Sequence, residues 1–375
     1  MDTPLTNPAL YLHSPGVAKI DDSPYPSISD PHDVIIRITY VGVCGSDVGY
    51  YSLRVLAGLL TKPSQVHFWT HGGIGAKVSP SHPLIMGHEA SGTIHEVGSS
   101  VTSLAPGDRV AIEPGYPCRR CKTCKAGRYN FCPQMTFAAN PPNSHGALRK
   151  YFKIPSDFCY KLPASMELDE GVLVEPLAVA VHVARLADIK IGQSVIAFGA
   201  GTVGLLCAAV AKAMGAGKIV AVDVNEARLE FAKQYAATGS YLPSREDSAD
   251  VTARKIIEGN SLPSEGADVV LEATGAEPCI EAGIHVLRSG GTFVQAGLGK
   301  AKIQFPIVAL SEKELNMKGS FRYNAGDYDL AMHLLESKKV SVKELITSIE
   351  PFERATEAWE RTRKGEGIKN LIRGP

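Results

Sequence analysis

The chain has 375 residues, a length that indicates about two domains, each large enough to bury a hydrophobic core. Its 39 basic and 39 acidic residues cancel, so no net charge attracts it to nucleic acid or to anionic lipid. Residues 1–4 lack the start of a secretion signal, and no apolar run approaches a membrane span. We therefore expect a cytoplasmic protein, bound neither to membrane nor to nucleic acid, whose partner is a small neutral molecule.

The first third of the chain indicates an irregular β-rich domain, because short β-type runs such as residues 34–40 alternate with stretches rich in glycine and proline. Cys44 lies in this part and is followed by His88 and Glu89. Zinc binds thiolate, imidazole and carboxylate, and three protein ligands leave a fourth position open for water or substrate. A single Cys or His is more often a core residue, so the trio predicts a catalytic metal site only together with other signals.

A second cysteine group is compact in the sequence. Four cysteines fall within 15 residues in the spacing Cys-x2-Cys-x2-Cys-x7-Cys: Cys118, Cys121, Cys124 and Cys132. Four thiolates form a closed tetrahedral site, and the neighbouring Arg and Lys residues favour the deprotonated form. The spacing predicts a structural zinc ion that stiffens one lobe. A loop disulfide and an iron–sulfur cluster are the alternatives.

The middle of the chain has the order of a dinucleotide-binding unit. A short apolar run, residues 194–198, precedes the turn Gly199-Ala200-Gly201-Thr202-Val203-Gly204, a helical stretch to Met214 and a second strand that ends at Asp223. Gly199 permits the turn, Gly201 lets the backbone approach a pyrophosphate, and Gly204 allows close helix packing. This order, with the acid 19 residues beyond the last glycine, predicts a Rossmann unit rather than a plain glycine turn, and we expect Val203 to contact the cofactor with the glycines.

Two residues bear on the choice of cofactor. Asp223 can accept hydrogen bonds from both ribose hydroxyls, and it would repel a 2′-phosphate by roughly 1 to 4 kcal/mol at about 4 Å. Arg228, one helical turn further along, could receive such a phosphate, stack on the adenine or pair with Asp223. We take Asp223 as decisive, which favours NAD over NADP.

After Asp223 the chain has further predicted strands of the same sheet, followed by a tail that is expected to belong to the first domain. Residues 267–272 and 291–295 read as further strands that flank an amphipathic stretch, residues 279–287. This alternation predicts an α/β fold with a doubly wound parallel sheet. The tail, residues 327–375, has helical patterns and is expected to return to the first domain.

The zinc trio, the four-cysteine loop and the later Rossmann unit, in this order, resemble the medium-chain zinc alcohol dehydrogenases over nearly the whole chain. The polyol branch fits best, and Gly275–Pro278 and Lys313–Asn316 look most like the fungal xylitol dehydrogenases, with the sorbitol dehydrogenases as close neighbours. The resemblance implies a GroES-like catalytic domain of residues 1–177 and 321–375, an NAD-binding Rossmann domain of residues 178–320, and a homo-oligomer.

The resemblance also implies roles for single residues. Cys44, His88 and Glu89 match the catalytic zinc ligands, and Glu175 matches the carboxylate that reaches the zinc-bound water or substrate. Ser46 would pass the proton toward solvent, with His67 as the next carrier. Phe68, Glu175, Arg322 and Tyr323 would bind the polyol. Six residues match the cofactor-binding segments: Ala296, Gly297, Leu298, Ser320, Phe321 and Arg322.

Three of these roles have simpler alternatives, since Arg322 could be a surface cation, Tyr323 a core aromatic and Glu175 an acid at a helix start. In the expected reaction, zinc lowers the pKa of the bound hydroxyl, an alkoxide forms near neutral pH, and hydride passes to the nicotinamide to leave a ketone. Xylitol is the leading substrate, with sorbitol and L-arabinitol behind it.

The chain departs from this family most clearly in one spacing; Phe68, where family members often carry Tyr, and Asn140, where others can have Thr, are smaller departures. Between Cys44 and His88 lie 43 residues, more than the polyol branch usually has, and joining Asp47 directly to Val66 isolates an insertion of 18 residues, Val48 to Gln65. We interpret it as a translated, unspliced intron; a genuine loop that covers the pocket is the rival interpretation. Because the insertion separates Ser46 from His67 in the chain, a cofactor-binding protein without turnover is the alternative function.

Overall fold

The structure is a computed structural model, and it describes residues 6–45, 68–72, 78–141 and 144–375. The chain forms two compact units, one of Met1–Glu175 with Ser341–Pro375 and the other of Pro176–Val340. The chain therefore returns to the first unit at Ser341, later than the expected return at residue 321. The reason is that helix α11 (Asp327–Glu336) is held by side chains of helix α5 (Val174–Ala187) within the second unit.

The first unit is built on a seven-stranded sheet in the order β10-β6-β5-β3-β18-β17, with β9 also paired to β3. Its strands are β3 (Asp33–Gly42), β5 (Glu89–Val97), β6 (Arg109–Ile112), β9 (Tyr151–Pro155), β10 (Cys159–Lys161), β17 (Ile346–Glu350) and β18 (Lys369–Arg373). Strand β3 pairs with three neighbours and is mostly buried, because its run of Val and Ile residues packs on both faces. The β-rich domain expected for the first third of the chain is present, and strands from the tail complete it.

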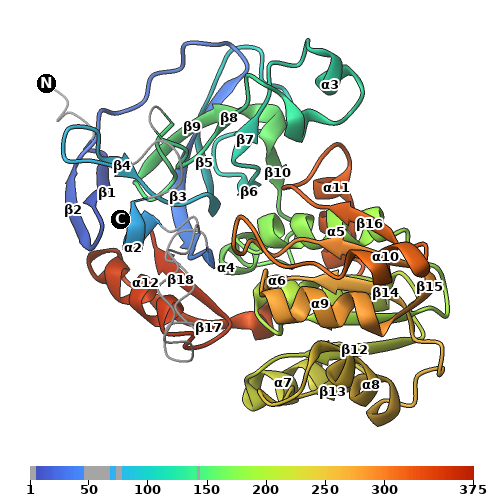
Figure 1. Ribbon diagram of the computed structural model, residues 1–375. Coiled ribbons are helices and arrows are strands. Elements are labelled where there is room, and N and C mark those ends of the chain that lie inside the picture. Colours follow the sequence, from blue (N-terminus) through green and yellow to red (C-terminus); the bar gives the residue numbers. More distant parts are fainter. Residues whose placement is uncertain (1–5, 46–67, 73–77, 142–143) are drawn as a thin grey trace, which may run out of the picture. The chain divides into compact units, whose positions relative to one another are not determined.

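Smaller elements surround this sheet (Figure 1). Among the described residues, the unit also has a three-stranded sheet in the order β2-β1-β4 and a two-stranded sheet of β7 and β8. The bounds are β1 (Pro8–Ser14), β2 (Val17–Asp22), β4 (Leu84–Ile85), β7 (Gly115–Tyr116) and β8 (Thr136–Phe137). The helices are α2 (Phe68–His71), α3 (Lys122–Lys125), α4 (Leu168–Gly171) and α12 (Ala355–Arg363), with the short 3-10 helices η1 (Tyr129–Phe131), η2 (Ser156–Phe158), η3 (Lys343–Leu345) and η4 (Phe352–Arg354).

Helix α2 is anchored to α12 through two tryptophans. The ring centroids of Trp69 and Trp359 are 5.2 Å apart, and the indole N–H of Trp69 donates to Glu360 Oε1 at 2.6 Å. Trp359 is fully buried in the core of the first unit, and Phe68 packs against the same core. These contacts attach α2 to the hydrophobic core of the first unit.

The second unit is a doubly wound sheet. Six parallel strands run in the order β13-β12-β11-β14-β15-β16: β11 (Ser194–Phe198), β12 (Lys218–Val222), β13 (Gly239–Tyr241), β14 (Ala267–Glu272), β15 (Leu287–Gln295) and β16 (Asn316–Gly319). The connecting helices are α6 (Thr202–Ala213), α7 (Glu226–Tyr235), α8 (Ala249–Gly259), α9 (Glu277–Val286) and α10 (Ile307–Glu312). Helices α6 and α7 contact each other, as do α8 and α9, so the pairs cover opposite faces of the sheet (Figure 1).

The expected α/β fold with a parallel Rossmann sheet is confirmed. Strand order reverses between β11 and β14, where the parallel sheet leaves a crevice outside its carboxyl edge, and ligands of doubly wound folds bind at this switch point. Among the described residues, every helix is too short or too polar to cross a lipid bilayer.

Candidate active site and metal centres

The predicted catalytic trio converges in the first unit. Cys44 follows the end of β3, and Glu89 begins β5, which pairs with β3 so that Gly42 lies opposite Glu89. The candidate ligand atoms of Cys44, His88 and Glu89 all lie within 4.8 Å of one another. Strand pairing thus brings together donors that 43 residues separate in the chain. Thiolate, imidazole and carboxylate in this grouping fit a zinc ion with one open position.

Two glycines permit this close approach. A Cβ atom on Gly42 would lie 2.1 Å from Glu89 Oε2, so a side chain there would displace the carboxylate. Gly87, directly before His88, has φ +91°, and a Cβ there would meet Val41 Cγ1 at 2.7 Å. Both positions require glycine, one for space and the other also for its left-handed backbone.

Lys369 holds the carboxylate of the trio. Its ammonium, buried at the start of β18, donates to Glu89 Oε2 at 2.5 Å and to the Val43 carbonyl at 3.2 Å. Burial disfavours the charged ammonium, but the charges of Glu89, Cys44 and Glu175 outweigh burial and raise the pKa of Lys369 above its ordinary value. Lys369 therefore offsets the negative charge of the site and orients Glu89, and sequence reasoning missed it.

Glu175 lies in the first turn of α5 and is 6% exposed. Its charge is among those that raise the pKa of Lys369. A helix start suits a carboxylate, because the helix dipole is positive there. The structure shows an acid at a helix start, and the expected contact of Glu175 with the zinc-bound water or substrate stays a prediction.

The four-cysteine loop closes around α3 and η1, and its four sulfur atoms lie within 4.8 Å of one another. Cys121 Sγ is 3.3 Å from Cys124 Sγ, and the backbone N–H groups of Cys118 and Cys121 point at sulfurs of the loop. All eight cysteines lie in the described part of the chain, and each is free of disulfides. Four convergent thiols without a disulfide fit a closed structural zinc site.

The thiols of this loop do not titrate alike. The Thr123 hydroxyl, with backbone N–H groups and the Cys124 thiol, lowers the pKa of Cys121 to about 6. Burial, together with hydrogen bonds to the neighbouring thiols, raises the pKa of Cys124 to about 12. A zinc ion among the sulfurs would supply the charge that lets Cys124 lose its proton.

The expected proton relay lies outside the described residues, whereas one expected substrate contact, Phe68, lies within them. Ser46, His67 and the insertion from Val48 to Gln65 lie outside the described residues. Phe68 is described: it begins α2 and is half-buried against the hydrophobic core of the first unit. Its expected contact with substrate stays a prediction.

In the second unit, the glycine turn after β11 adopts the geometry expected for a dinucleotide. Gly199 has φ +97°, and a Cβ on Gly204 would lie 1.8 Å from the Gly199 carbonyl oxygen, so the helix can approach the turn only with glycine there. The backbone N–H of Ala200 donates to Asp223 Oδ2 at 2.7 Å, and that of Asn225 donates to Oδ1 at 2.9 Å. Asp223 is thus fixed between the turn and the end of β12. Gly201 and Val203, at the start of α6, and Arg228, in α7, are half-buried.

The segments expected to bind cofactor also lie at the carboxyl edge of the parallel sheet. Ala296, Gly297 and Leu298 follow β15, and Ser320, Phe321 and Arg322 follow β16. Gln295 Oε1 and Ser320 Oγ are buried there without a hydrogen-bond partner among the described residues. Buried polar atoms without partners are costly, so two such atoms at this edge fit a polar ligand such as a nicotinamide cofactor.

Glu272 joins two of these segments and was also missed. Its buried carboxylate accepts from the backbone N–H of Gly275 at 2.8 Å and from Gln295 Nε2 at 2.6 Å, while its carbonyl accepts from the N–H groups of Ala296 and Gly297, each at 2.8 Å. Burial raises the pKa of Glu272 despite these donors. The residue therefore holds the loop after β14 against the loop after β15.

Arg322 and Tyr323 differ in their surroundings. Arg322 has φ +55°, which is uncommon for a residue other than glycine, and its guanidinium lies 4.8 Å from the centre of the Phe321 ring. Tyr323 is 2% exposed and packs edge-on against Tyr328, with ring centroids 4.9 Å apart. The surroundings of Tyr323 are those of a core aromatic, and its expected contact with the polyol stays a prediction.

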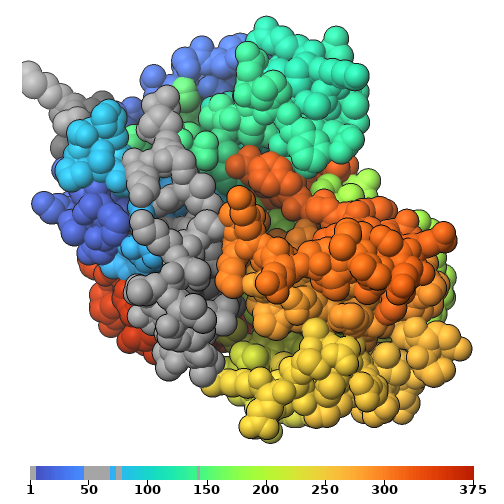
Figure 2. Space-filling model, in the orientation of Figure 1, coloured from blue at the N-terminus to red at the C-terminus, as the bar shows by residue number. Residues whose placement is uncertain are grey.

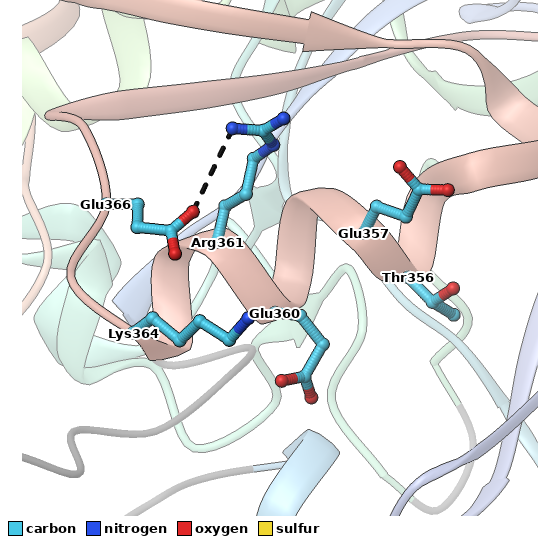
Figure 3. Close-up of a pocket in the computed structure, with 6 residues that line it drawn as sticks. All are labelled: Thr356, Glu357, Glu360, Arg361, Lys364 and Glu366. Carbon is cyan, nitrogen blue, oxygen red and sulfur yellow. Dashed lines mark ion pairs between the residues drawn. The ribbon is translucent and has the colours of Figure 1, made fainter.

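A surface hollow of about 320 Å³ lies elsewhere in the first unit, around α12. It is lined by Thr356, Glu357, Glu360, Arg361, Lys364 and Glu366. In Figure 3 the Arg361 side chain points toward Glu366, and the two groups form an exposed ion pair at 3.9 Å. Solvated ion pairs of this kind carry little binding energy, so the trio and the Rossmann edge remain the candidate sites.

Comparison with known proteins supports these assignments. Residues 30–164 match the alcohol dehydrogenase GroES-like domain, and residues 202–337 match the zinc-binding dehydrogenase domain. The chain is 53% identical over 356 residues to the D-xylulose reductase A of Aspergillus niger. The aligned region covers 95% of this chain and 93% of that protein. It belongs to the polyol branch of the medium-chain zinc alcohol dehydrogenases. As a member of this family it is an oxidoreductase that uses zinc and a nicotinamide cofactor.

Solved structures agree with this family. An oxidoreductase of unknown specificity from Escherichia coli is 33% identical, with a TM-score of 0.87 over 99% of this dehydrogenase and 100% of that chain. The L-idonate 5-dehydrogenase of Escherichia coli is 25% identical, with a TM-score of 0.84 over 98% of both chains. The predicted family, including its GroES-like and Rossmann domains, is confirmed.

Proposed function

We propose that this dehydrogenase interconverts xylitol and D-xylulose with NAD, using a zinc ion held by Cys44, His88 and Glu89. The observation that carries the proposal is the convergence of these three donors within 4.8 Å. Similarity to a D-xylulose reductase over 95% of the chain supports the choice of substrate. Sorbitol and L-arabinitol are the alternative substrates.

The residues around the trio have separate tasks in this proposal. A bound zinc ion would lower the pKa of the substrate hydroxyl and so favour the alkoxide from which hydride leaves. Lys369 donates to Glu89 Oε2 and so orients the carboxylate that would help to hold the metal. Glu175 would bind the substrate or a water molecule at the open position. Ser46 and His67 would carry the released proton toward solvent.

Polyol recognition is assigned to Glu175, Arg322, Tyr323 and Phe68. A polyol differs from a short alcohol in its additional hydroxyls, and a site that hydrogen-bonds them rejects substrates that lack them. A steady-state assay with NAD and xylitol, sorbitol, L-arabinitol or 2-propanol tests the proposal. We expect the highest kcat/KM with xylitol. Better turnover of another polyol would overturn the substrate assignment, and better turnover of 2-propanol would overturn polyol specificity.

The preference for NAD is a separate proposal that rests on Asp223. Its two carboxylate oxygens each accept a backbone N–H, and the remaining lone pairs can accept the ribose hydroxyls. A 2′-phosphate would meet the same negative charge. The nearby Arg228 could offset that repulsion only if it turned toward the phosphate.

Asp223→Ser is expected to lower the ratio of kcat/KM for NAD to that for NADP by about 5-fold to 1,000-fold, because repulsion of roughly 1 to 4 kcal/mol is removed. Initial rates with each cofactor measure the ratio. Asp250→Asn, which neutralises an exposed acid on α8, is the matched control and should leave the ratio unchanged. An unchanged ratio in Asp223→Ser would argue that another group selects the cofactor.

We also propose that two copies associate along β16. This edge strand is exposed at all four residues, and apolar side chains are exposed on it and on α10: Ile307 at 58%, Val308 at 64% and Met317 at 43%. The orange segment that includes α10 and β16 forms part of the surface on the face shown in Figure 2. Antiparallel pairing of β16 with its copy across a twofold axis would join the two sheets at this edge and cover these side chains.

Val308→Asp combined with Met317→Asp is expected to convert a dimer, or a tetramer built from such dimers, into smaller species, because the charges would be buried at the proposed interface. Sedimentation velocity measures the mass against the 40.0 kDa of one chain. Ile191→Asp, at an apolar residue that is 89% exposed elsewhere in the unit, is the control. A monomeric parent protein, or a double variant with the parent's mass, would refute the proposed interface.

The cytoplasmic location stays a proposal as well. It is supported by eight cysteines of which none forms a disulfide, as is usual in a reducing compartment. Cell fractionation with an antibody against the chain tests it, and recovery with membranes or organelles would contradict it.

A further inference from the structure

An ionic network around a buried carboxylate joins α5 to α11 in the second unit, with His182 buried and the Arg185 side chain 45% exposed. The carboxylate of Asp327 is fully buried and accepts from His182 Nδ1 at 2.8 Å, from Arg185 Nη1 at 2.5 Å and from the backbone N–H of Asn324 at 2.6 Å. His182, 5% exposed, must carry a proton on Nδ1 to donate to the carboxylate. We name these three side chains, His182, Arg185 and Asp327, the α5–α11 clamp.

The clamp forms hydrogen bonds with the backbone of the turn at residues 324–327. Arg185 Nη1 also donates to the Ala325 carbonyl at 3.2 Å, and the N–H of Asp327 donates to the Asn324 carbonyl at 3.1 Å. Gly326, with φ +84°, ends the turn as the N-cap residue directly before α11. Because His182 and Arg185 are three residues apart on α5, both side chains reach the turn from one side of that helix.

This turn directly follows the segment proposed to touch substrate and nicotinamide. Ser320 is tied to β15 by its N–H, which donates to the Gln295 carbonyl at 2.8 Å, and the clamp holds the chain again from Asn324. Between the two anchors lies Arg322 with its left-handed backbone, a conformation that persists only where surrounding contacts impose it. Tyr323, packed on Tyr328 of α11, lies next to the clamp.

We propose that His182, Arg185 and Asp327 are positioning residues for polyol recognition: they set the backbone of Arg322 and Tyr323, and through it the contacts to the hydroxyls that a short alcohol lacks. Burying the Asp327 carboxylate costs desolvation free energy that offsets its attraction to His182 and Arg185, and well-packed apolar residues would stabilise the fold equally well. Three donors that converge on one carboxylate instead specify one geometry. The inference rests on the proposed function, since the substrate role of Arg322 and Tyr323 belongs to it.

The test compares His182→Leu, which removes the donor to Asp327, with His182→Asn, whose amide can occupy the place of Nδ1–H. Asp327→Asn is the second disrupting variant. Asp188→Asn, which breaks an exposed pair with Lys190 just beyond α5, is the control. For each variant, kcat/KM is measured with xylitol and with 2-propanol, NADH affinity by fluorescence, and zinc content by metal analysis.

We expect His182→Leu and Asp327→Asn to lower kcat/KM for xylitol by about 10-fold to 100-fold, because a misplacement of about 1 Å has effects of this size. The loss with 2-propanol should stay below about threefold, with zinc content and NADH affinity near those of the parent, and His182→Asn should recover most of the xylitol activity. Equal losses on both substrates, or no loss, would overturn the inference.

Hydrogen exchange supplies a readout that does not need turnover. In the disrupted variants the amides of residues 321–326 should exchange at least about tenfold faster, while those of β11 and β14 keep their rates. Unchanged exchange at 321–326 would show that the clamp does not hold the segment. If the parent protein oxidises no polyol, the proposed function fails, and the exchange rates still decide whether the clamp sets this backbone.

Discussion

His88→Ala is expected to lower kcat/KM for xylitol by at least about three orders of magnitude, because the site loses a metal ligand and with it the several kcal/mol by which zinc stabilises the developing alkoxide. Zinc content should fall from two ions per chain to one, since the four-cysteine loop is a separate cluster. NADH affinity should stay within about threefold, because the cofactor segments belong to the other unit.

The matched control is His95→Ala on the same strand, β5. His95 lies 3.7 Å from Glu96 as a half-exposed pair and is outside the metal cluster, so its loss should leave both zinc ions and the activity in place. Metal analysis, NADH fluorescence and initial rates follow both variants. A His88→Ala protein that keeps two zinc ions and full turnover would remove the trio from the mechanism.

Deletion of Val48 to Gln65 is expected to raise kcat/KM for xylitol by about 100-fold or more. In the parent sequence 20 residues separate Ser46 from His67, whereas the shortened chain reads Cys-Gly-Ser-Asp-Val-His-Phe-Trp, with the two relay residues close together. General acid–base catalysis typically contributes about 100-fold to 10,000-fold. Loop entropy is not the obstacle, since the closure cost of 18 extra residues is only roughly 0.5 kcal/mol.

The control for this deletion is the shortened chain with His67→Ala, which should lose most of the gain. Activity confined to the shortened form would mean that the longer chain binds cofactor without turnover, which is the alternative function. Equal activity in both forms would favour a genuine loop. Transcript sequencing decides the intron interpretation separately, because abundant mRNA that keeps these codons would exclude it.

Local features were predictable because their chemistry lies within short segments. The four cysteines are spaced so that adjacent turns of one loop bring their sulfurs together, and the glycine turn, helix and acid of the Rossmann unit follow one another within 25 residues. Donor type alone then indicates zinc for the loop, and the position of Asp223 after β12 indicates a ribose. The structure places all of these residues as the spacing requires.

Long-range partners escaped prediction because nothing in the local sequence marks them. Lys369 lies 280 residues from Glu89, and only the pairing of β18 with β3 brings its ammonium to the carboxylate. His182 and Asp327 are 145 residues apart and meet where side chains of α5 reach the first residue of α11. A lone lysine, histidine or aspartate on an amphipathic segment is usually a surface residue, so its burial beside an opposite charge becomes visible only in three dimensions.

By itself, the amino-acid sequence determined the donor sets, the order of the two domain types and the family, because these depend on residue chemistry and short spacings. The tertiary structure decided which residues surround those donors: the glycine that lets Glu89 approach β3, the lysine that balances its charge, and the clamp beside Arg322. It also moved the return to the first unit from residue 321 to Ser341. Burial and strand pairing between distant segments supply the physical reason, since both depend on the folded chain as a whole.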